Sequence, residues 1–150
     1  MLNIYNVRNE DQKARMEKAD KEKICPFCPK GLIEIHKLPV EKEIGNFFTT
    51  KTAFPYEGTE THYLIISKNH IVEPDQITDY DWQDIGKIFN WVIKKTKISG
   101  GALFWRFGDM KKNGSSIAHF HMHVISGSSS EKESEDTRES IKVKLGYKKK

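Results

Sequence analysis

Three histidines alternate with three hydrophobic residues late in the chain, in the run His119-Phe120-His121-Met122-His123-Val124. In a β-strand, side chains two positions apart point to the same face and lie about 6.6 Å apart. The alternation therefore predicts a strand with three imidazoles on one face and Phe120, Met122 and Val124 in a core. Half of the six histidines fall within five residues, which disfavours an ordinary half-exposed strand that is histidine-rich by chance.

Shorter patterns predict the other elements around this strand. Acid-base pairs four positions apart predict a solvated helix over residues 8–23, and Thr78 is an expected N-cap for a helix that runs to about Lys95. Apolar residues recur on one face of that second helix at Trp82, Ile85, Ile88, Phe89, Val92 and Ile93. Strands are expected at 32–36, 44–50, 61–67, 102–107 (buried), 118–126 and 141–145, with a tight turn at 25–31 and a polar loop at 108–116. The fold class is therefore α+β with an antiparallel sheet.

The length of 150 residues is that of one domain. We expect an N-terminal helical extension at 1–23, a main domain at 24–126 and a mobile, charged C-terminal tail at 127–150. The longest apolar stretches are too short to cross a bilayer, and the N-terminus shows no apolar signal segment. The expectation is a soluble cytoplasmic protein with no membrane contact.

The charge pattern argues against a nucleic-acid partner. Lysine and arginine number 25 against 21 acidic residues, which gives a net charge of +4. Three of those four charges are Lys148, Lys149 and Lys150 at the end of the chain. The excess is thus a tail rather than a basic face that could follow a duplex.

The two cysteines form a Cys-x-x-Cys pair, Cys25 and Cys28. Such a pair, in a chain without a secretory signal, indicates a metal site or a redox site rather than a structural disulfide. The redox interpretation would need a thioredoxin-like strand–helix context, which residues 25–31 lack. His70 and one histidine of the alternating run could complete a Cys2His2 zinc site. Of the remaining histidines, His36 is expected on a strand facing solvent, and His62 is either structural or near the site.

The loop before the histidine run could hold a phosphate. Asn113, Gly114, Ser115 and Ser116 offer backbone N–H groups and hydroxyls at the entry to the strand. Polar loops with glycine are common, so the signal depends on the three imidazoles beside it.

The run from His119 to Ile125 resembles the histidine triad (HIT) motif, His-φ-His-φ-His-φ-φ, at every position. Residues 61–71 resemble the family's central strand, although Ser67 stands where a proline is usual. The cysteine pair resembles the zinc knuckle of the zinc-binding HIT branch and of the related galactose-1-phosphate uridylyltransferases. The resemblance covers residues 24–126 and implies a HIT-like fold: an antiparallel sheet of about five strands with one long helix, paired as a homodimer.

The resemblance also implies a reaction at the α-phosphorus of a nucleotide conjugate or dinucleoside polyphosphate. His121 would be the nucleophile and would form a covalent nucleotidyl-histidine, with its other ring nitrogen bonded to a main-chain carbonyl. His123 and Ser116 would stabilise the phosphate or the leaving group, and Asn113, Gly114, Ser115, Ser116 and His123 would bind the nucleotide phosphate. A structural zinc ion would be held by Cys25, Cys28, His70 and His119.

Two departures from the family pattern bear on the substrate. Gly114-Ser115-Ser116 stands where many HIT hydrolases have Gly-Gln-Ser or Gly-Gln-Thr, and residues 54–57 lack the usual acidic or amide ribose ligand. Three alternatives to a hydrolase or nucleotidyltransferase are a nucleotide phosphorylase, a non-catalytic nucleotide-binding module and a zinc-stabilised scaffold.

Overall fold

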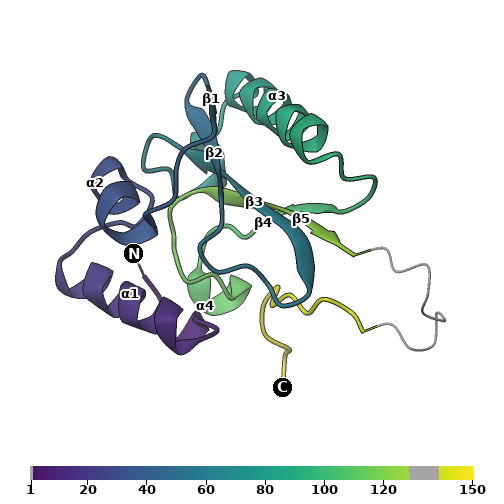
Figure 1. Ribbon diagram of the computed structural model, residues 1–150. Helices are drawn as coiled ribbons and strands as arrows, with labels where there is room; N and C mark the ends of the chain where they lie inside the picture. The colour runs from purple at the N-terminus through teal and green to yellow at the C-terminus, as the bar shows by residue number, and fades with distance from the viewer. Residues whose placement is uncertain (1, 129–138) are drawn as a thin grey trace.

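A single antiparallel sheet organises the chain in the computed structural model, which describes residues 2–128 and 139–150 (Figure 1). The strand order is β1-β2-β3-β5-β4. The strands span Lys42–Ile44 (β1), Phe47–Lys51 (β2), Thr59–Ser67 (β3), Ala102–Trp105 (β4) and His121–Gly127 (β5). The five-stranded antiparallel sheet and the α+β class are as predicted.

The central strands β3 and β5 place the histidine run in the middle of the sheet. Leu64 pairs with His123 and Ile66 pairs with His121, so these residues share one face. On the far side of β5, Phe104 of β4 pairs with His123. His123 is thus flanked by strands on both sides and His121 by β3 on one side, which limits how far their backbone can move.

The face opposite the histidines packs against the long helix α3, Asp79–Thr96 (Figure 1). Thr78 caps this helix by accepting a hydrogen bond from the N–H of Asp81, as predicted. The core on this face combines residues of the sheet with one side of α3, namely Phe47, Tyr63, Ile65, Ile71, Ile85, Ile88, Val92, Phe120, Met122 and Val124. The three hydrophobic residues of the histidine run are therefore buried as predicted.

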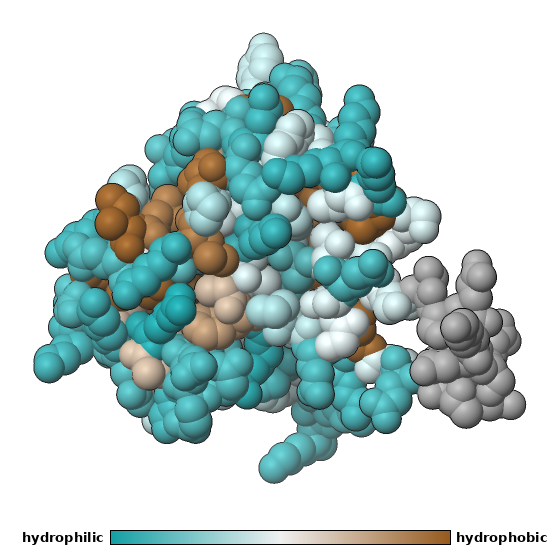
Figure 2. All heavy atoms as spheres, in the orientation of Figure 1, coloured by the Kyte–Doolittle hydropathy of each residue, from teal (hydrophilic) through white to brown (hydrophobic). Residues whose placement is uncertain are grey.

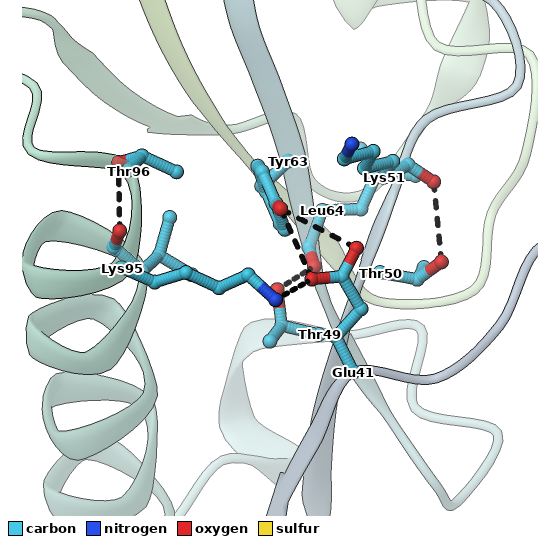
Figure 3. A network of polar contacts seen from close by, with 9 residues as sticks. Glu41, Thr49, Thr50, Lys51, Tyr63, Leu64, Lys95 and Thr96 are labelled. Atoms are coloured by element: carbon cyan, nitrogen blue, oxygen red, sulfur yellow. Dashed lines mark hydrogen bonds and ion pairs between the residues drawn. The ribbon is translucent and has the colours of Figure 1, made fainter.

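A polar contact ties the C-terminal end of α3 to the sheet (Figure 3). Glu41, just before β1, receives hydrogen bonds from the Tyr63 hydroxyl at 3.0 and 3.3 Å and pairs with the Lys95 ammonium at 2.5 Å. Burial opposes ionisation of Glu41, but the hydrogen bonds from Lys95 and Tyr63 outweigh it and lower its pKa. Burial and Glu41 raise the pKa of Tyr63 to about 12.

The histidine face packs against the N-terminal part of the chain. Helices α1 (Glu10–Lys21) and α2 (Pro29–Gly31) lie on this side of the sheet (Figure 1). A second core joins them to β2 and β3 through Met16, Ala19, Ile24, Cys25, Phe27, Ile35, Phe48, Leu64, Ile66 and Ile117. Met16 and Ala19 of α1 are almost fully buried, so the thin apolar content of this helix is enough to hold it against the domain.

The predicted strand at 32–36 is wrong. Leu32–His36 forms a π-helical turn (η2) that continues from α2, and residues 29–31 of the expected tight turn are helical. Gly31 sits against the Cys25 carbonyl so closely that an added Cβ would lie 1.9 Å from its oxygen. A larger residue than glycine would not fit at this point of the turn. His36, which was expected to face solvent, is buried with its Nε2 3.2 Å from Thr50 Oγ1.

Three other boundaries differ from the prediction. The 44–50 strand is a hairpin, because Gly45 adopts a φ of +53° between β1 and β2. The expected buried strand at 102–107 is an edge strand that ends at Trp105, with Ala102 and Leu103 exposed. The loop at 108–116 contains a short helix, α4 (Met110–Asn113), and β5 starts at His121 rather than at 118.

The C-terminal segment follows a path back along the domain. Residues 129–138 of the predicted tail lie outside the described residues, and 139–150 contain no strand, so the expected strand at 141–145 is absent there. The carbonyl of Lys144 accepts a hydrogen bond from Arg106 Nη1 at 2.9 Å, and the Tyr147 hydroxyl bonds Asn6. The described end of the chain therefore contacts the histidine side of the molecule.

Hydrophilic residues cover most of the visible surface, and hydrophobic ones gather over α2 and the following turn (Figure 2). Within the described residues, no helix combines the length and the apolar character that a membrane crossing requires.

Candidate active site and metal cluster

Two cysteines and two histidines converge in the structure, and one of these histidines is the first of the run, His119. The sulfurs of Cys25 and Cys28 and the Nδ1 atoms of His70 and His119 all lie within 4.8 Å of one another. Cys25 Sγ is 3.4 Å from His119 Nδ1, Cys28 Sγ is 3.3 Å from His70 Nδ1, and the two Nδ1 atoms are 3.2 Å apart. The fold thus gathers four predicted metal ligands from three separate segments of the chain.

The spacing and protonation of these groups fit a tetrahedral metal ion. Ligands about 2.0–2.3 Å from a central ion stand roughly 3.3–3.8 Å from one another in a tetrahedron. His119 Nε2 carries the ring proton and donates it to the Ser67 carbonyl at 2.7 Å. Nδ1 is therefore unprotonated, and its lone pair faces the cluster. Burial and the neighbouring Cys25 raise the pKa of the Cys28 thiol to about 11, so a cation is needed to favour the thiolate pair. The cluster can therefore bind a metal.

Phe27 connects the cluster to the second histidine. It lies between the two cysteines, and its ring packs against His121 at 5.1 Å and against His119 at 6.1 Å between centroids. The Cys-x-x-Cys turn therefore supports the His121 ring from one side without supplying it a polar contact.

His121 is held in one tautomer by its own strand. Its Nδ1 donates to the His119 carbonyl at 2.7 Å, so the remaining nitrogen, Nε2, carries a lone pair. Nε2 makes no hydrogen bond to the described residues, and the ring lines the main cavity on this face. Burial lowers the pKa of His121 to about 4, so the ring is neutral at pH 7. A neutral imidazole with an unpaired Nε2 is a competent nucleophile.

His123 belongs to a chain of hydrogen bonds whose direction is fixed at one end. The backbone N–H of Tyr56 donates to His62 Nδ1 at 3.2 Å, so His62 must carry its proton on Nε2. That proton is donated to His123 Nδ1 at 2.9 Å, which leaves the His123 proton on Nε2. His123 Nε2 lies 3.0 Å from Arg106 Nη2, which is also a donor.

At the Arg106 end of this chain, two donors meet with no acceptor between them. The His123 N–H and the Arg106 guanidinium face each other, and Arg106 Nε is buried with no partner in the described residues. Burial, with Arg8 and Arg106 nearby, lowers the pKa of His62 to about 3 and holds that of His123 well below its ordinary value. Both rings are therefore neutral, and the Tyr56 N–H holds their protons in this arrangement, so the donor–donor contact remains. An anionic oxygen placed between His123 and Arg106 would accept from both.

Cations from distant parts of the chain surround the same cavity. Arg8 and Arg15 come from the N-terminal segment and α1, Arg106 follows β4, and Lys144 comes from the C-terminal segment. Burial, with Arg106 adding to it, lowers the pKa of Arg8 despite the opposite effect of Tyr56. The cavity therefore has a positive potential suited to a phosphate-bearing ligand.

The predicted phosphate loop divides into two groups. Gly114 and Ser116 line the cavity together with His121 and His123. Asn113 and Ser115 serve the loop itself, because Asn113 Oδ1 accepts from the Ser115 N–H at 2.7 Å and the Ser115 hydroxyl donates to the Ile117 carbonyl at 2.9 Å. A phosphate contact through their side chains stays a prediction.

Sequence reasoning overlooked Arg8, Arg106 and Tyr56, and it left His62 open. Period-two alternation could have placed His62 on the site face, because it stands two residues before Leu64, the partner of His123. The same rule places Arg106 two residues after Phe104 on that face. No local pattern signals Arg8, whose position depends on how the N-terminal segment crosses the domain.

The fold and the site define an α+β protein with a Cys2His2 cluster behind a cationic histidine pocket. The sequence matches the HIT domain family over residues 40–130, more than half of the chain. This chain belongs to the HIT family.

Solved structures of the family resemble the chain. A HIT family hydrolase from Legionella pneumophila is 25% identical and has a TM-score of 0.54, with 70% of this chain and 94% of that one covered. A zinc-bound histidine triad family protein from Mycobacterium smegmatis is 20% identical, with a TM-score of 0.51 and coverage of 74% and 80%. The second likeness supports the fold alone. No curated protein matches the sequence.

Proposed function

We propose that this protein is a nucleotidyl hydrolase or transferase that acts through a covalent nucleotidyl-histidine on His121. The observation that carries the proposal is the 2.7 Å bond from His121 Nδ1 to the His119 carbonyl, because it fixes an unprotonated Nε2 inside a cationic cavity. The Legionella relative is described as a hydrolase, which agrees with this class of activity.

The proposed reaction has two displacements at the α-phosphorus. In the first, the His121 Nε2 lone pair forms an N–P bond while the P–O bond to the leaving group breaks and its electrons leave with the oxygen. In the second, a water oxygen attacks phosphorus, the N–P bond breaks, and Nε2 recovers its lone pair while the water proton passes to solvent. Splitting one displacement into two lowers each barrier.

His123, Ser116 and Arg106 stabilise the phosphate in both steps. The His123 Nε2–H and the Arg106 guanidinium supply donors that face the same space. Ser116 lines the cavity and can add its hydroxyl. Such donors act most strongly on the charge that develops at the phosphate oxygens in a cavity that excludes water.

We further propose that Cys25, Cys28, His70 and His119 hold a structural zinc ion. The support is the tetrahedral spacing of a two-sulfur, two-nitrogen ligand set. The ligand set does not include His121, so its Nε2 stays free for the proposed reaction. A bound ion would fix the segment that leads into β5.

A homodimer is also proposed. Among the described residues, the edge strand β4 has no strand on its outer side, and Leu103 within it and Phe107 after it are 39% and 57% exposed. An exposed edge with apolar side chains can pair with a second copy. Sedimentation equilibrium tests this directly, and a strictly monomeric protein at micromolar concentration would contradict it.

The catalytic assignment is tested by comparing the parent protein with two variants, His121→Ala and His123→Ala, in the turnover of fluorogenic nucleotide conjugates. His121→Ala should lower kcat/KM by at least about a thousandfold, because a covalent nucleophile is lost. His123→Ala should lower it by about a hundredfold, because the chemistry persists without one donor. Both variants should keep the parental metal content and melting temperature.

The same assay separates the alternatives. A phosphorylase would give nucleoside diphosphate only when inorganic phosphate is added. A binding module would bind nucleotide with no turnover by the parent, and a zinc-stabilised scaffold would show neither. Parental activity in His121→Ala would overturn the nucleophile assignment.

A further inference from the structure

The end of the chain, residues 139–150, runs along the cavity and is called the C-terminal segment below. Near its start, Ile141 lies against Gly127 at the end of β5, where an added Cβ would be 3.2 Å from Ile141 Cδ1. Further on, Lys144 lines the cavity, and its side chain lies over Gly114, where an added Cβ would approach Cγ and Cδ to 2.8 Å. The segment therefore passes from the end of β5 to the loop that leads into β5.

Lys144 also contacts the cation that we propose binds the reacting phosphate. Its carbonyl accepts a hydrogen bond from Arg106 Nη1 at 2.9 Å, while Arg106 Nη2 lies 3.0 Å from His123 Nε2. The guanidinium lies over the Phe104 ring, 5.6 Å from its centroid. Because His123 Nε2 is itself a donor, the Lys144 carbonyl is the only acceptor that the described residues give this guanidinium. The direction of Arg106 therefore depends on where residue 144 lies.

Two contacts just beyond Lys144 fix the position of the segment. Gly146 has a φ of +140° and lies so close to the Lys112 carbonyl that an added Cβ would be 2.5 Å from its oxygen. Both the backbone conformation and the close approach require glycine at this point. One residue later, the Tyr147 hydroxyl donates a hydrogen bond to Asn6 Oδ1.

Asn6 connects the segment to the loop and to the N-terminal part of the chain. Its side chain is buried, and Nδ2 donates to the carbonyls of Met110 at 3.1 Å and Ser115 at 2.7 Å. With Oδ1 accepting from Tyr147, both polar atoms of the amide are used. Asn6 and Tyr147 lie outside residues 40–130, so this contact is not part of the region that matches the family.

Resting on the proposed function, we infer that the C-terminal segment belongs to the active site and that Gly146 and Tyr147 are positioning residues for Arg106. The close approach of the first and the hydrogen bond of the second fix residues 146–147, and the Lys144 carbonyl then directs the guanidinium. If the segment were displaced, Arg106 would lose its acceptor and turn toward water, because a charge without a partner is costly to bury. The reacting phosphate would then lose a cationic donor.

The segment contributes little to the stability of the domain, which allows its effect on the site to be measured separately. None of its residues belongs to either hydrophobic core. Leu145 and Tyr147 are 68% and 57% exposed. Changes in the segment should therefore alter the active site without unfolding the protein.

The rate constant of adduct formation on His121, measured in a single turnover with saturating nucleoside polyphosphate, tests the inference. Gly146→Ala should displace the backbone of the segment and lower this rate constant at least about tenfold. Tyr147→Phe keeps the ring but removes one hydrogen bond and should lower it about threefold. Both variants should melt within about 2 °C of the parent.

Tyr80→Phe is the matched control for the loss of a hydroxyl. Tyr80 is 79% exposed on α3, its hydroxyl makes no hydrogen bond to the described residues, and it does not line the cavity. This variant should therefore keep the parental rate constant.

A double-mutant cycle separates positioning of Arg106 from a general structural role. In an Arg106→Ala background, Gly146→Ala should change the rate constant less than about twofold, because no guanidinium remains to be held. The same tenfold loss in both backgrounds would show that the segment acts elsewhere and would overturn the assignment.

The remaining outcomes distinguish the inference from the proposed function. A parent and a Gly146→Ala variant that form the adduct at the same rate would overturn the inference and leave the proposed function intact. A parent that forms no adduct would overturn the proposed function, and binding of guanosine or adenosine monophosphate by the same proteins then decides the inference. Gly146→Ala should bind the monophosphate at least about fivefold more weakly than the parent, and equal binding would overturn the inference as well.

Discussion

Replacing Cys28 by serine should release the metal and destabilise the whole domain. Cys28 Sγ faces both ring nitrogens of the cluster, at 3.3 Å from His70 Nδ1 and 3.6 Å from His119 Nδ1. Serine keeps the size of the side chain but is a poor zinc ligand, so three ligands would remain. The bound ion cross-links residues as far apart as Cys25 and His119, which are separated by 94 positions.

The magnitude follows from that cross-link. Closing a loop of this length lowers the entropy of the unfolded chain by an amount equivalent to about 4–5 kcal/mol in the chain-entropy estimate, as an upper bound. The two hydrophobic cores remain in the variant, so we expect a loss of about 3 kcal/mol rather than complete unfolding. For a domain of 150 residues this corresponds to a fall of about 10 °C in melting temperature.

Metal analysis and thermal unfolding are the assays, and a chelator provides the matched control. The parent purified without chelator should contain one zinc ion per chain. Treatment with chelator should lower the parental melting temperature to that of Cys28→Ser and leave the variant unchanged. A metal-free parent with a Cys25–Cys28 disulfide would refute the reasoning, as would a variant that melts within about 2 °C of the metal-loaded parent.

Three other outcomes are expected. Glu41→Gln should cost about 1 kcal/mol of unfolding free energy in urea titrations. Because the folded pKa of Glu41 is lowered from 4.5, the difference from the parent should be full above that value and vanish as the pH falls through the folded pKa, and a difference that grows in acid would contradict the sign. His62→Phe keeps a ring beside Tyr56 but removes the donor to His123, so kcat should fall at least about tenfold while KM changes less than about twofold. Truncation after residue 128 should leave the fold intact but weaken nucleotide binding, since it removes Lys144 from the cavity. Aggregation of the truncated chain would show that the segment is part of the core.

The alternation of hydrophobic and polar residues explains why much of the sheet could be predicted from the sequence. Phe120, Met122 and Val124 alternate with histidines, and both faces of β5 are buried by different layers, so one register satisfies every residue. The α3 helix could also be predicted, because its N-capping threonine and the start of its apolar face indicate the same first turn.

The helical segment over residues 29–36, after the cysteine pair, could not be predicted in the same way. Ile33 and Ile35 alternate as in a strand, yet Ile33 is 78% exposed and Ile35 is buried in a π-helical turn. The fold there includes the close approach of Gly31 to the Cys25 carbonyl six positions earlier, which the alternation of Ile33 and Ile35 does not signal. Arg8 escaped notice for a related reason, since its contacts with Phe54 and Tyr56 join residues nearly fifty positions apart.

Mass spectrometry of the protein during turnover tests the central claim most directly. Brief incubation of the parent with a nucleoside polyphosphate, followed by a rapid quench at alkaline pH that preserves N–P bonds, should give a mass increase of one nucleoside monophosphate residue. Peptide mapping should place it on His121, and His121→Ala should show no adduct while His123→Ala still forms one. An adduct on a different residue, or turnover by the parent with no adduct at any time point, would contradict the account.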